Sequence, residues 1–289
     1  MRGKDKAIQP QPDQEKHPTP AHARCQGLPR PSWPSCRKPR RWVAVLALFA
    51  FLAHARLQAQ DSARQDCDRL HQRQQFQDAL ACLKPLAKGG DAAAQSSLGF
   101  MYFQGEGVPT DDRRAVFWYR KAARQGYAKA QYNLGWMYAN GRGVTQDVQM
   151  AMTWFRKAAE QGDTMAQTYL GAAYANGQGV AKDEQAAAQW FRRAAEQGDA
   201  AAQYNLGVMY AQGRGVAQDA KQAATWFRKA AEQGVAQAQF NLGVAYANGE
   251  GVPKDEQAAA QWLHKAAAQG NAEARLALDW LHDNGQGTP

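Results

Sequence analysis

The sequence has few of the residues from which a catalytic or metal site is built. Beyond residue 59 there are only three histidines, and their spacing matches no metal-ligand motif. The only serines there are Ser62, Ser96 and Ser97, and none lies in a nucleophile elbow. The sequence therefore predicts no catalytic residue, no metal and no cofactor, and we expect a protein that is not an enzyme.

Net positive charge is also scarce in most of the chain, although the formal net charge of the whole sequence is +9. Residues 1–59 hold 11 of the 35 Lys and Arg residues and 3 of the 26 Asp and Glu residues, so residues 60–289 are nearly neutral. A nucleic-acid-binding protein needs positive charge on its folded module, because neutralising phosphates supplies most of the non-specific affinity. We therefore expect no nucleic-acid partner.

No apolar run in the sequence is long enough to cross a membrane. Residues 1–41 hold eight of the 12 prolines, which remove backbone donors, so we expect a disordered, basic leader. Residues 42–59 join a short apolar block to small residues, as in a secretory signal peptide, with cleavage predicted after Ala59. A block of about twelve residues is too short to span about 30 Å of hydrocarbon. We expect a periplasmic or secreted protein without stable membrane insertion; an uncleaved membrane anchor or a buried core helix is the alternative. About forty residues ahead of the basic pair at residues 40–41 are unusual for a signal peptide, which suggests a start codon further downstream.

Two of the four cysteines lie beyond the predicted cleavage site. Cys67 and Cys82 enclose a loop of 14 residues. An even pair in an oxidising compartment predicts a disulfide. Two buried free thiols are the alternative, because free cysteine also packs as a small apolar residue.

From residue 91 onward, the sequence repeats with a period of 36 residues. Leu-Gly recurs at 98–99, 134–135, 170–171, 206–207 and 242–243, and Trp recurs at 118, 154, 190, 226 and 262. A Gly-x-Gly-Val motif follows each Leu-Gly pair on the same period. A fixed period of this length indicates one supersecondary unit stacked on its neighbours.

The unit at residues 127–162 predicts two helices. Apolar residues at helical spacing indicate a first helix that ends at Gly141, and a second apolar stripe follows Asp147, which is placed to cap it. Gly162 ends the second helix and Asp163 caps the next first helix. The expected buried residues are Ala130, Leu134, Met137, Tyr138, Ala151, Trp154, Phe155, Ala158 and Ala159.

Glycine also recurs inside each first helix, where it costs about 1 kcal/mol relative to alanine. Gly135 and Gly171 are two examples. This recurrence predicts a helix–helix contact that is too close for a side chain.

These residues closely resemble the Sel-1-like repeat, a branch of the tetratricopeptide-repeat superfamily. The matching unit is Ala-x-x-x-Leu-Gly-x-x-Tyr, then Gly-x-Gly-Val-x-x-Asp, then Ala-x-x-Trp-Phe-x-x-Ala-Ala-x-x-Gly, in five repeats over residues 91–270. Tyr119 and Leu263 replace the Phe after Trp, and Tyr127 and Val235 replace the Asp that caps a first helix. Residues 60–90 resemble a degenerate N-terminal capping repeat, and residues 271–289 a C-terminal capping helix and tail with Asp279 at the usual Gly. The resemblance implies an all-α, right-handed α-solenoid of helix–turn–helix repeats, and we expect a monomer.

The resemblance also suggests where a partner binds, because in this superfamily the first helices line the concave face. Asn on that face commonly holds ligand backbone or carboxylate groups in tetratricopeptide relatives, since its amide both donates and accepts. The alternative is that these Asn side chains bond across neighbouring first helices and serve only the stack. The expected partner-binding residues are Tyr132, Asn133, Trp136, Asn140, Tyr204, Asn205, Val208, Phe240, Asn241 and Val244.

We therefore expect an exported scaffold or adaptor of the bacterial envelope that binds a protein or peptide along its concave face. A secreted factor that acts on a host or competitor through binding is the alternative. Some exported cysteine-rich relatives have been linked with binding or hydrolysing penicillin-like compounds, so a β-lactam- or cell-wall-related hydrolase is a third. Unlike those relatives, residues 91–270 contain no cysteine.

Overall fold

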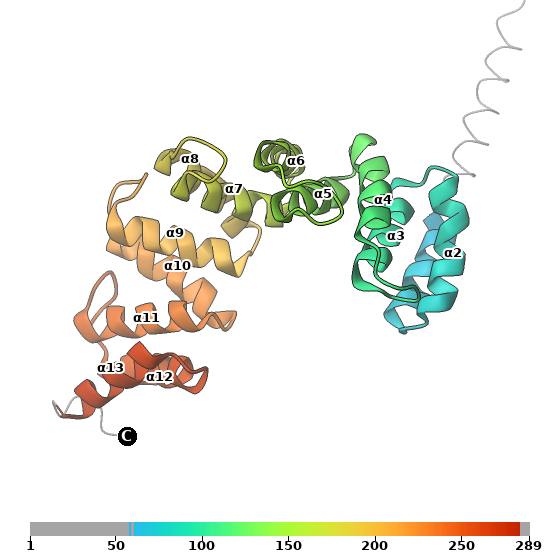
Figure 1. Cartoon of the computed structure of the whole chain (residues 1–289). Helices are drawn as coiled ribbons and strands as arrows, with labels where there is room; N and C mark the ends of the chain where they lie inside the picture. The colour runs from blue at the N-terminus through green and yellow to red at the C-terminus, as the bar shows by residue number, and fades with distance from the viewer. Residues whose placement is uncertain (1–57, 59–60, 284–289) are drawn as a thin grey trace, which may run out of the picture. The chain divides into compact units, whose positions relative to one another are not determined.

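The structure is a computed structural model that describes residue 58 and residues 61–283 (Figure 1). In this part of the chain every regular element is a helix, beginning with one at residues 61–72. The helices that follow are Phe76–Lys88 (α2), Ala92–Gln104 (α3), Asp112–Arg124 (α4), Ala128–Asn140 (α5), Val148–Glu160 (α6), Thr164–Asn176 (α7), Glu184–Glu196 (α8), Ala200–Gln212 (α9), Ala220–Glu232 (α10), Ala236–Asn248 (α11), Glu256–Ala268 (α12) and Ala272–Asp283 (α13). The predicted leader and almost all of the predicted signal segment lie outside the described residues.

The odd-numbered helices α3 to α11 are the first helices of the repeats, and the even-numbered helices α4 to α12 are the second helices. Each first helix packs against its own second helix, and each second helix packs against the next first helix (Figure 1). First helices of neighbouring repeats also contact each other, as in α7 with α9 and α11 with α13. The predicted all-α repeat solenoid is confirmed. None of the described helices is long and apolar enough to cross a membrane.

The predicted helix ends are confirmed. The Asp147 carboxylate accepts a hydrogen bond from Met150 N at 2.9 Å, and α5 ends at Gly141, whose φ is 65°. Residues other than glycine rarely adopt this left-handed backbone conformation, so a glycine ends the helix there. The same carboxylate cap begins α3, α4, α7, α8, α9, α10 and α12. Helices α5 and α11 have Tyr127 and Val235 at the capping position and so have no side-chain cap.

The glycine inside each first helix makes room for a side chain of the second helix. A Cβ atom at Gly171 would lie 2.7 Å from Cδ1 of Phe191, and one at Gly243 would lie 2.8 Å from Cγ of Leu263. The predicted close helix–helix contact is therefore confirmed. The glycine position of α13 holds Asp279, which is exposed, since no second helix covers it in the described chain.

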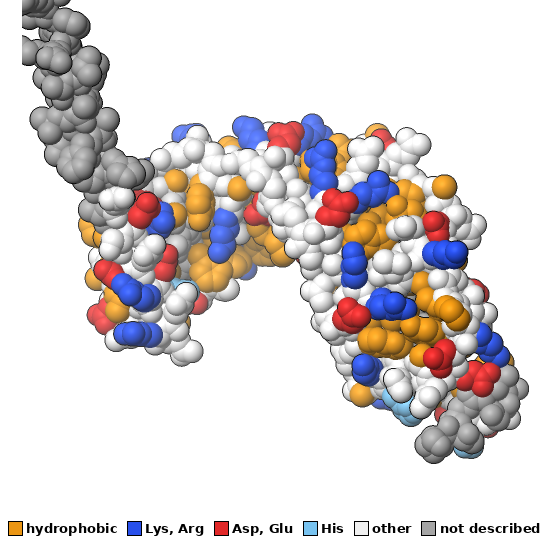
Figure 2. All heavy atoms as spheres, turned by 180° about the vertical axis from the view of Figure 1, so that it is seen from behind, with side chains coloured by type: hydrophobic (Ala, Val, Ile, Leu, Met, Phe, Trp, Pro, Cys, Tyr) orange, Lys and Arg blue, Asp and Glu red, His pale blue; other side chains and the backbone are white. Residues whose placement is uncertain are grey.

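The predicted burial is wrong for Tyr138 and Trp154, which are only half-buried. The tryptophans lie at the edge of the buried stripe, and a basic side chain one helical turn later covers each ring. Lys157 Nζ lies 4.7 Å from the ring centre of Trp154, and Lys229 Nζ lies 4.1 Å from that of Trp226. Figure 2 shows Lys and Arg side chains lying among apolar surface on one face of the molecule.

A ladder of buried glutamines connects the repeats, and the sequence reasoning missed it. Gln203 donates from Nε2 to Ala195 O at 3.1 Å, while its Oε1 accepts from Gln233 Nε2 at 2.8 Å. Both polar atoms of this buried side chain are thereby satisfied, as burial requires. The same pattern joins Gln95, Gln131, Gln167 and Gln239 to Gln125, Gln161, Gln197 and Gln269, respectively.

The Gly-x-Gly-Val turns also pack across repeats. A Cβ atom at Gly107 would lie 2.7 Å from the backbone oxygen of Phe76, at the start of the preceding second helix. In the next repeat Arg142, the residue between the two glycines, donates two hydrogen bonds to Asp112 at the start of α4, at 2.6 and 2.8 Å. The motif is therefore a turn that joins two helices and contacts the preceding repeat.

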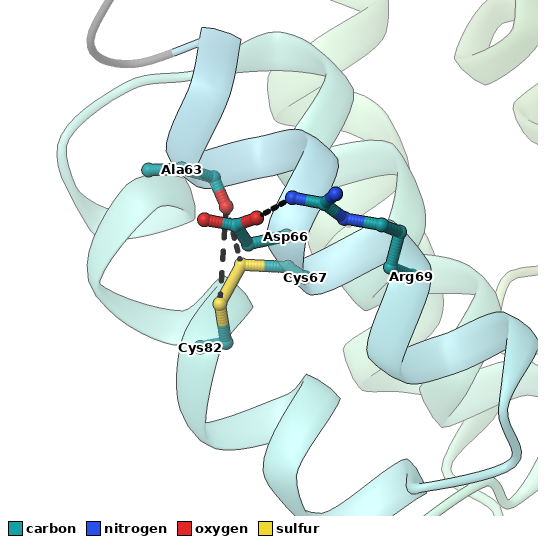
Figure 3. Close-up of a disulfide and its surroundings, with 5 residues drawn as sticks. All are labelled: Ala63, Asp66, Cys67, Arg69 and Cys82. Carbon is teal, nitrogen blue, oxygen red and sulfur yellow. Dashed lines mark hydrogen bonds and ion pairs between the residues drawn. A yellow bond between two sulfur atoms is a disulfide. The ribbon is translucent and has the colours of Figure 1, made fainter.

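The helix at residues 61–72 is joined to α2 by the predicted disulfide between Cys67 and Cys82 (Figure 3). Their Cα atoms are 5.5 Å apart, within the normal range for such a bond. Cys67 is fully buried in the cluster that also holds Leu83. The alternative of two free thiols is therefore wrong.

Candidate functional site

Two cavities adjoin each other at first helices α3 and α5. The larger has a volume of about 480 Å³ and includes residues from the helix at 61–72, and the smaller has a volume of about 170 Å³. Phe100 and Asn133 line both cavities. The smaller cavity is otherwise lined by Phe103, Tyr119, Tyr132, Trp136 and Met137. Three predicted partner-binding residues, Tyr132, Asn133 and Trp136, therefore meet at one place.

Aromatic rings form the wall of the smaller cavity. The Phe103 and Trp136 rings meet edge to face with their centres 5.3 Å apart. The guanidinium carbon of Arg142 lies 4.7 Å from the ring centre of Phe103, on the side chain that also pairs with Asp112. These contacts hold the rings of the aromatic wall in place.

The asparagines predicted to bind a partner differ in their hydrogen bonds. Asn140 donates to Trp136 O at 2.8 Å, and Asn205 donates to Ala201 O at 2.9 Å, so both amides bond within their own helices. Among the described residues, Asn133 and Asn241 have no hydrogen-bond partner, and each lines a cavity. None of the four bonds to a neighbouring first helix, which was the alternative interpretation.

A further cavity of about 440 Å³ lies at α9, α10 and α11. Val208, Phe240, Asn241 and Val244 all line it, so four more predicted residues meet there. Tyr204, Asn140 and Asn205 line none of the three cavities at these helices. Tyr204 instead packs toward the second helix, with its ring centre 6.2 Å from that of Phe227.

Helix α7 separates the two groups of predicted residues. At the positions that Tyr132 and Trp136 occupy in α5, α7 carries Thr168 and Ala172. The Thr168 hydroxyl donates to Asp199 at 3.1 Å, which ties α7 to the start of the next first helix. The predicted face is therefore divided into two apolar areas and is not one continuous site.

Burial keeps two of the predicted partner-binding tyrosines, Tyr132 and Tyr204, uncharged. Desolvation is the main cause that raises the pKa of Tyr132, followed by the nearby charge of Asp163. Desolvation also raises the pKa of Tyr204, with a smaller contribution from Glu273. Both phenols therefore remain protonated at neutral pH and present hydroxyl groups without charge.

The larger N-terminal cavity has a different character, because Arg64, Asp68, His71 and Lys129 line it. His71 is partly exposed, and its Nε2 lies 2.6 Å from Glu106 Oε2, so it connects the helix at 61–72 to the first Gly-x-Gly turn. His264 and His282 are exposed.

Two serines reach the same cavity as His71. Ser96 and Ser97 line it, but in the described structure neither hydroxyl is hydrogen-bonded to the imidazole, which is paired with Glu106. A serine nucleophile needs a base within hydrogen-bond reach, so this arrangement assigns no catalytic role. Across the described residues, no group of three His, Cys, Asp or Glu side chains is placed to hold a metal ion.

Known proteins share both the repeat and its structure. A Sel1 repeat protein from Oxalobacter formigenes is 39% identical over 75% of this chain and 89% of its own, with a TM-score of 0.69. A protective antigen present in uropathogenic Escherichia coli strains, which displays an SLR fold, is 42% identical over 72% of this chain, with a TM-score of 0.69. This chain spans only 45% of the length of that antigen. No curated protein matches.

The repeats themselves match a family model, that of the Sel1 repeat. The matched segments are residues 92–127, 128–163, 164–199, 200–235, 236–271 and 271–289. Five of the six have the full length of 36 residues, and together they cover most of the chain. The chain therefore belongs to the Sel1 repeat family, as its motifs predicted.

Proposed function

We propose that this chain is an exported scaffold that binds a partner polypeptide on its first helices, with Asn133 and Trp136 as central contacts. Sel1 repeat proteins are generally protein–protein interaction scaffolds. The observation that carries the proposal is the position of Asn133. Its unpaired amide lies where a polar and an apolar cavity meet, one helical turn before Trp136.

The two side chains suit complementary parts of a polypeptide. Trp136, half-buried and held by Phe103, offers a rigid aromatic surface of the kind that dominates binding energy at protein interfaces. The Asn133 amide offers one acceptor and two donor hydrogens, which match the C=O and N–H of a peptide backbone. The pairing fits an extended segment that places an apolar side chain against Trp136.

Export is the second part of the proposal. The Cys67–Cys82 disulfide supports it, because such bonds persist in oxidising compartments. Sequencing the N-terminus of the protein recovered outside the cytoplasm tests the cleavage site, and we expect it to begin at Gln60. Recovery of the chain with residues 1–59 still attached would overturn cleavage.

A secreted factor is a second candidate, and one relative favours it. The matched Escherichia coli protein is a protective antigen present in uropathogenic strains. Cell fractionation separates the two candidates. Retention in the periplasm supports the envelope scaffold, and recovery from the culture medium supports the secreted factor.

Partner capture with matched variants tests the site. We expect the wild-type chain and Phe117→Ala to retain the same partner from an envelope extract, and the double variant Asn133→Ala/Trp136→Ala to lose it. Phe117 is a suitable control because it is an aromatic residue of a second helix with 50% of its surface exposed. Equal capture by all three proteins, measured by quantitative mass spectrometry, would show that the site lies elsewhere.

A further inference from the structure

The charged residues of the repeats are confined almost entirely to the second helices. The five first helices, α3, α5, α7, α9 and α11, contain 65 residues, of which only Lys129 is charged. The five second helices have the same total length and contain 19 Asp, Glu, Lys and Arg residues. Burial does not explain the difference, because several first-helix residues that line cavities are partly exposed.

Apolar and amide side chains take the place of charge on the first helices. We define the N-terminal area as Phe100, Phe103, Tyr132 and Trp136, and the C-terminal area as Val208, Phe240 and Val244. An asparagine without a hydrogen-bond partner in the described structure lies beside each area: Asn133 beside the first and Asn241 beside the second. Helix α13 continues the second area, since Leu276 and Trp280 follow Phe240 and Val244 by one period and are 70% and 56% exposed.

We propose that the first helices bind an extended, uncharged polypeptide segment with two apolar anchors, one in each area. This inference rests on the proposed function and adds the chemistry of the partner. A charged side chain laid on these helices would lose its hydration, which is unfavourable. Amide and hydroxyl groups of the partner pay a smaller desolvation cost, because Asn133 and Asn241 can form hydrogen bonds with them.

Of the charges that border the two areas, Arg142 is already bound to Asp112. Glu250 accepts a hydrogen bond from Asn248, so ion pairing with either charge offsets little of the lost hydration. Lys129 lies in the adjoining polar cavity.

The stack sets the spacing between the two anchors. Three repeat steps separate α5, which carries Trp136, from α11, which carries Phe240. Packed helices lie about 10 Å apart, so the two areas are about 30 Å apart along the stack. An extended chain covers about 3.3 Å per residue, so the anchors of the segment lie about nine residues apart.

Selection from a random 16-residue peptide library displayed on phage tests this inference with the purified chain. We expect the enriched peptides to be depleted in Asp, Glu, Lys and Arg and to carry two large apolar residues about nine positions apart. Because no ion pair is formed, their affinity should change less than twofold between about 0.05 and 0.5 M NaCl, where exposed charges are increasingly screened.

Variants connect the selected peptides to the two areas. Trp136→Ala and Phe240→Ala should each weaken binding at least tenfold, while Phe117→Ala should leave it unchanged. Asn241→Asp keeps the shape of the side chain and adds one charge, so it should weaken binding at least fivefold. Its control is Gln189→Glu, the same kind of change on an exposed position of α8. Circular dichroism of each variant confirms that the fold is retained.

The other outcomes distinguish the two proposals. Enriched peptides that carry charges, bind less tightly at high salt and still require Trp136 would overturn the uncharged partner but leave the proposed function standing. Peptides that bind equally well to Trp136→Ala and Asn133→Ala would overturn the proposed function as well. Failure to enrich any peptide would overturn both.

Discussion

The first and second helices of each repeat are equally long, yet their side chains differ in kind. The second helices carry the tryptophans that recur every 36 residues, the aromatic or leucine side chains that pack against the first-helix glycines, and nearly all of the charge. The first helices carry the glycines, the buried glutamines and a partly exposed surface of aromatic and amide groups. Stacking explains the glycines and glutamines, but it does not require the other first-helix surface to lack charge.

The difference in charge suggests different roles for the two kinds of helix. On the second helices, Lys and Arg side chains cover the tryptophan rings and carry charge to the surface. The first helices present the surface that we propose binds a partner. Four predictions sharpen this comparison, from the largest expected effect to the smallest.

The opening helix pair lacks the glycine of the later repeats and carries a disulfide. In place of the glycine, the helix at residues 61–72 has Ala63, and the Cys67–Cys82 bond links it to α2 (Figure 3). Replacing both cysteines by serine should cost about 3 kcal/mol, the value expected for a loop of this length. Thermal unfolding should show a lower Tm, and a reducing agent should lower the Tm of the wild type but not of the variant. Equal Tm values would contradict this role of the bond.

Gly171→Leu tests the close contact between first and second helices. The new side chain would overlap the Phe191 ring, so we expect a loss of roughly 1–3 kcal/mol and a fall in Tm of several degrees. Asp279→Leu is the matched control, because nothing described in the chain covers this position in α13. Similar losses for both variants would show that the second helix does not cause the effect.

Asp183→Ala removes the cap of a second helix. The Asp183 carboxylate accepts a hydrogen bond from Ala186 N at 2.9 Å, and losing such a cap costs about 1 kcal/mol. Gln185→Ala, an exposed change in the first turn of the same helix, should have little effect on unfolding by urea. A midpoint that is the same for both variants would mean that the cap contributes nothing.

Lys129→Gln removes the only charge of the five first helices and should have the smallest effect. Lys129 is exposed, so we expect the free energy of unfolding to change by less than about 0.5 kcal/mol. We also expect less than a twofold change in the affinity for a captured partner, measured by calorimetry. A large loss of affinity would mean that the partner is acidic near this residue.

The sequence predicted the parts of the fold that depend on local signals. Asp147 and Gly141 mark helix ends because capping and left-handed turns involve only neighbouring residues. Gly171 predicted a close contact between helices, because glycine destabilises a helix interior and recurs at this position only where a side chain would not fit. Contacts between repeats were harder to predict. Gln203 and Gln233 recur with the same period as the tryptophans, but the period does not reveal that residues 30 positions apart are hydrogen-bonded.

The candidate site was predicted less completely than the fold. Asn133 and Asn205 occupy the same place in their repeats, but Asn205 bonds to its own helix, whereas Asn133 lines two cavities. Periodicity places both side chains on one face and cannot distinguish them. The division of the face by Thr168 and Ala172 is visible in the sequence, but its effect depends on how α7 packs beside α9.

Site-specific photo-crosslinking tests the central claim most directly. A photo-reactive amino acid is placed at position 136 on α5 in one protein and at position 117 on α4 in the other, in living cells. These positions compare a first helix with a second helix, since both carry a large aromatic side chain. We predict a discrete crosslinked partner from position 136 and none from position 117. Crosslinks from position 117 alone, or the same products from both positions, would contradict the account.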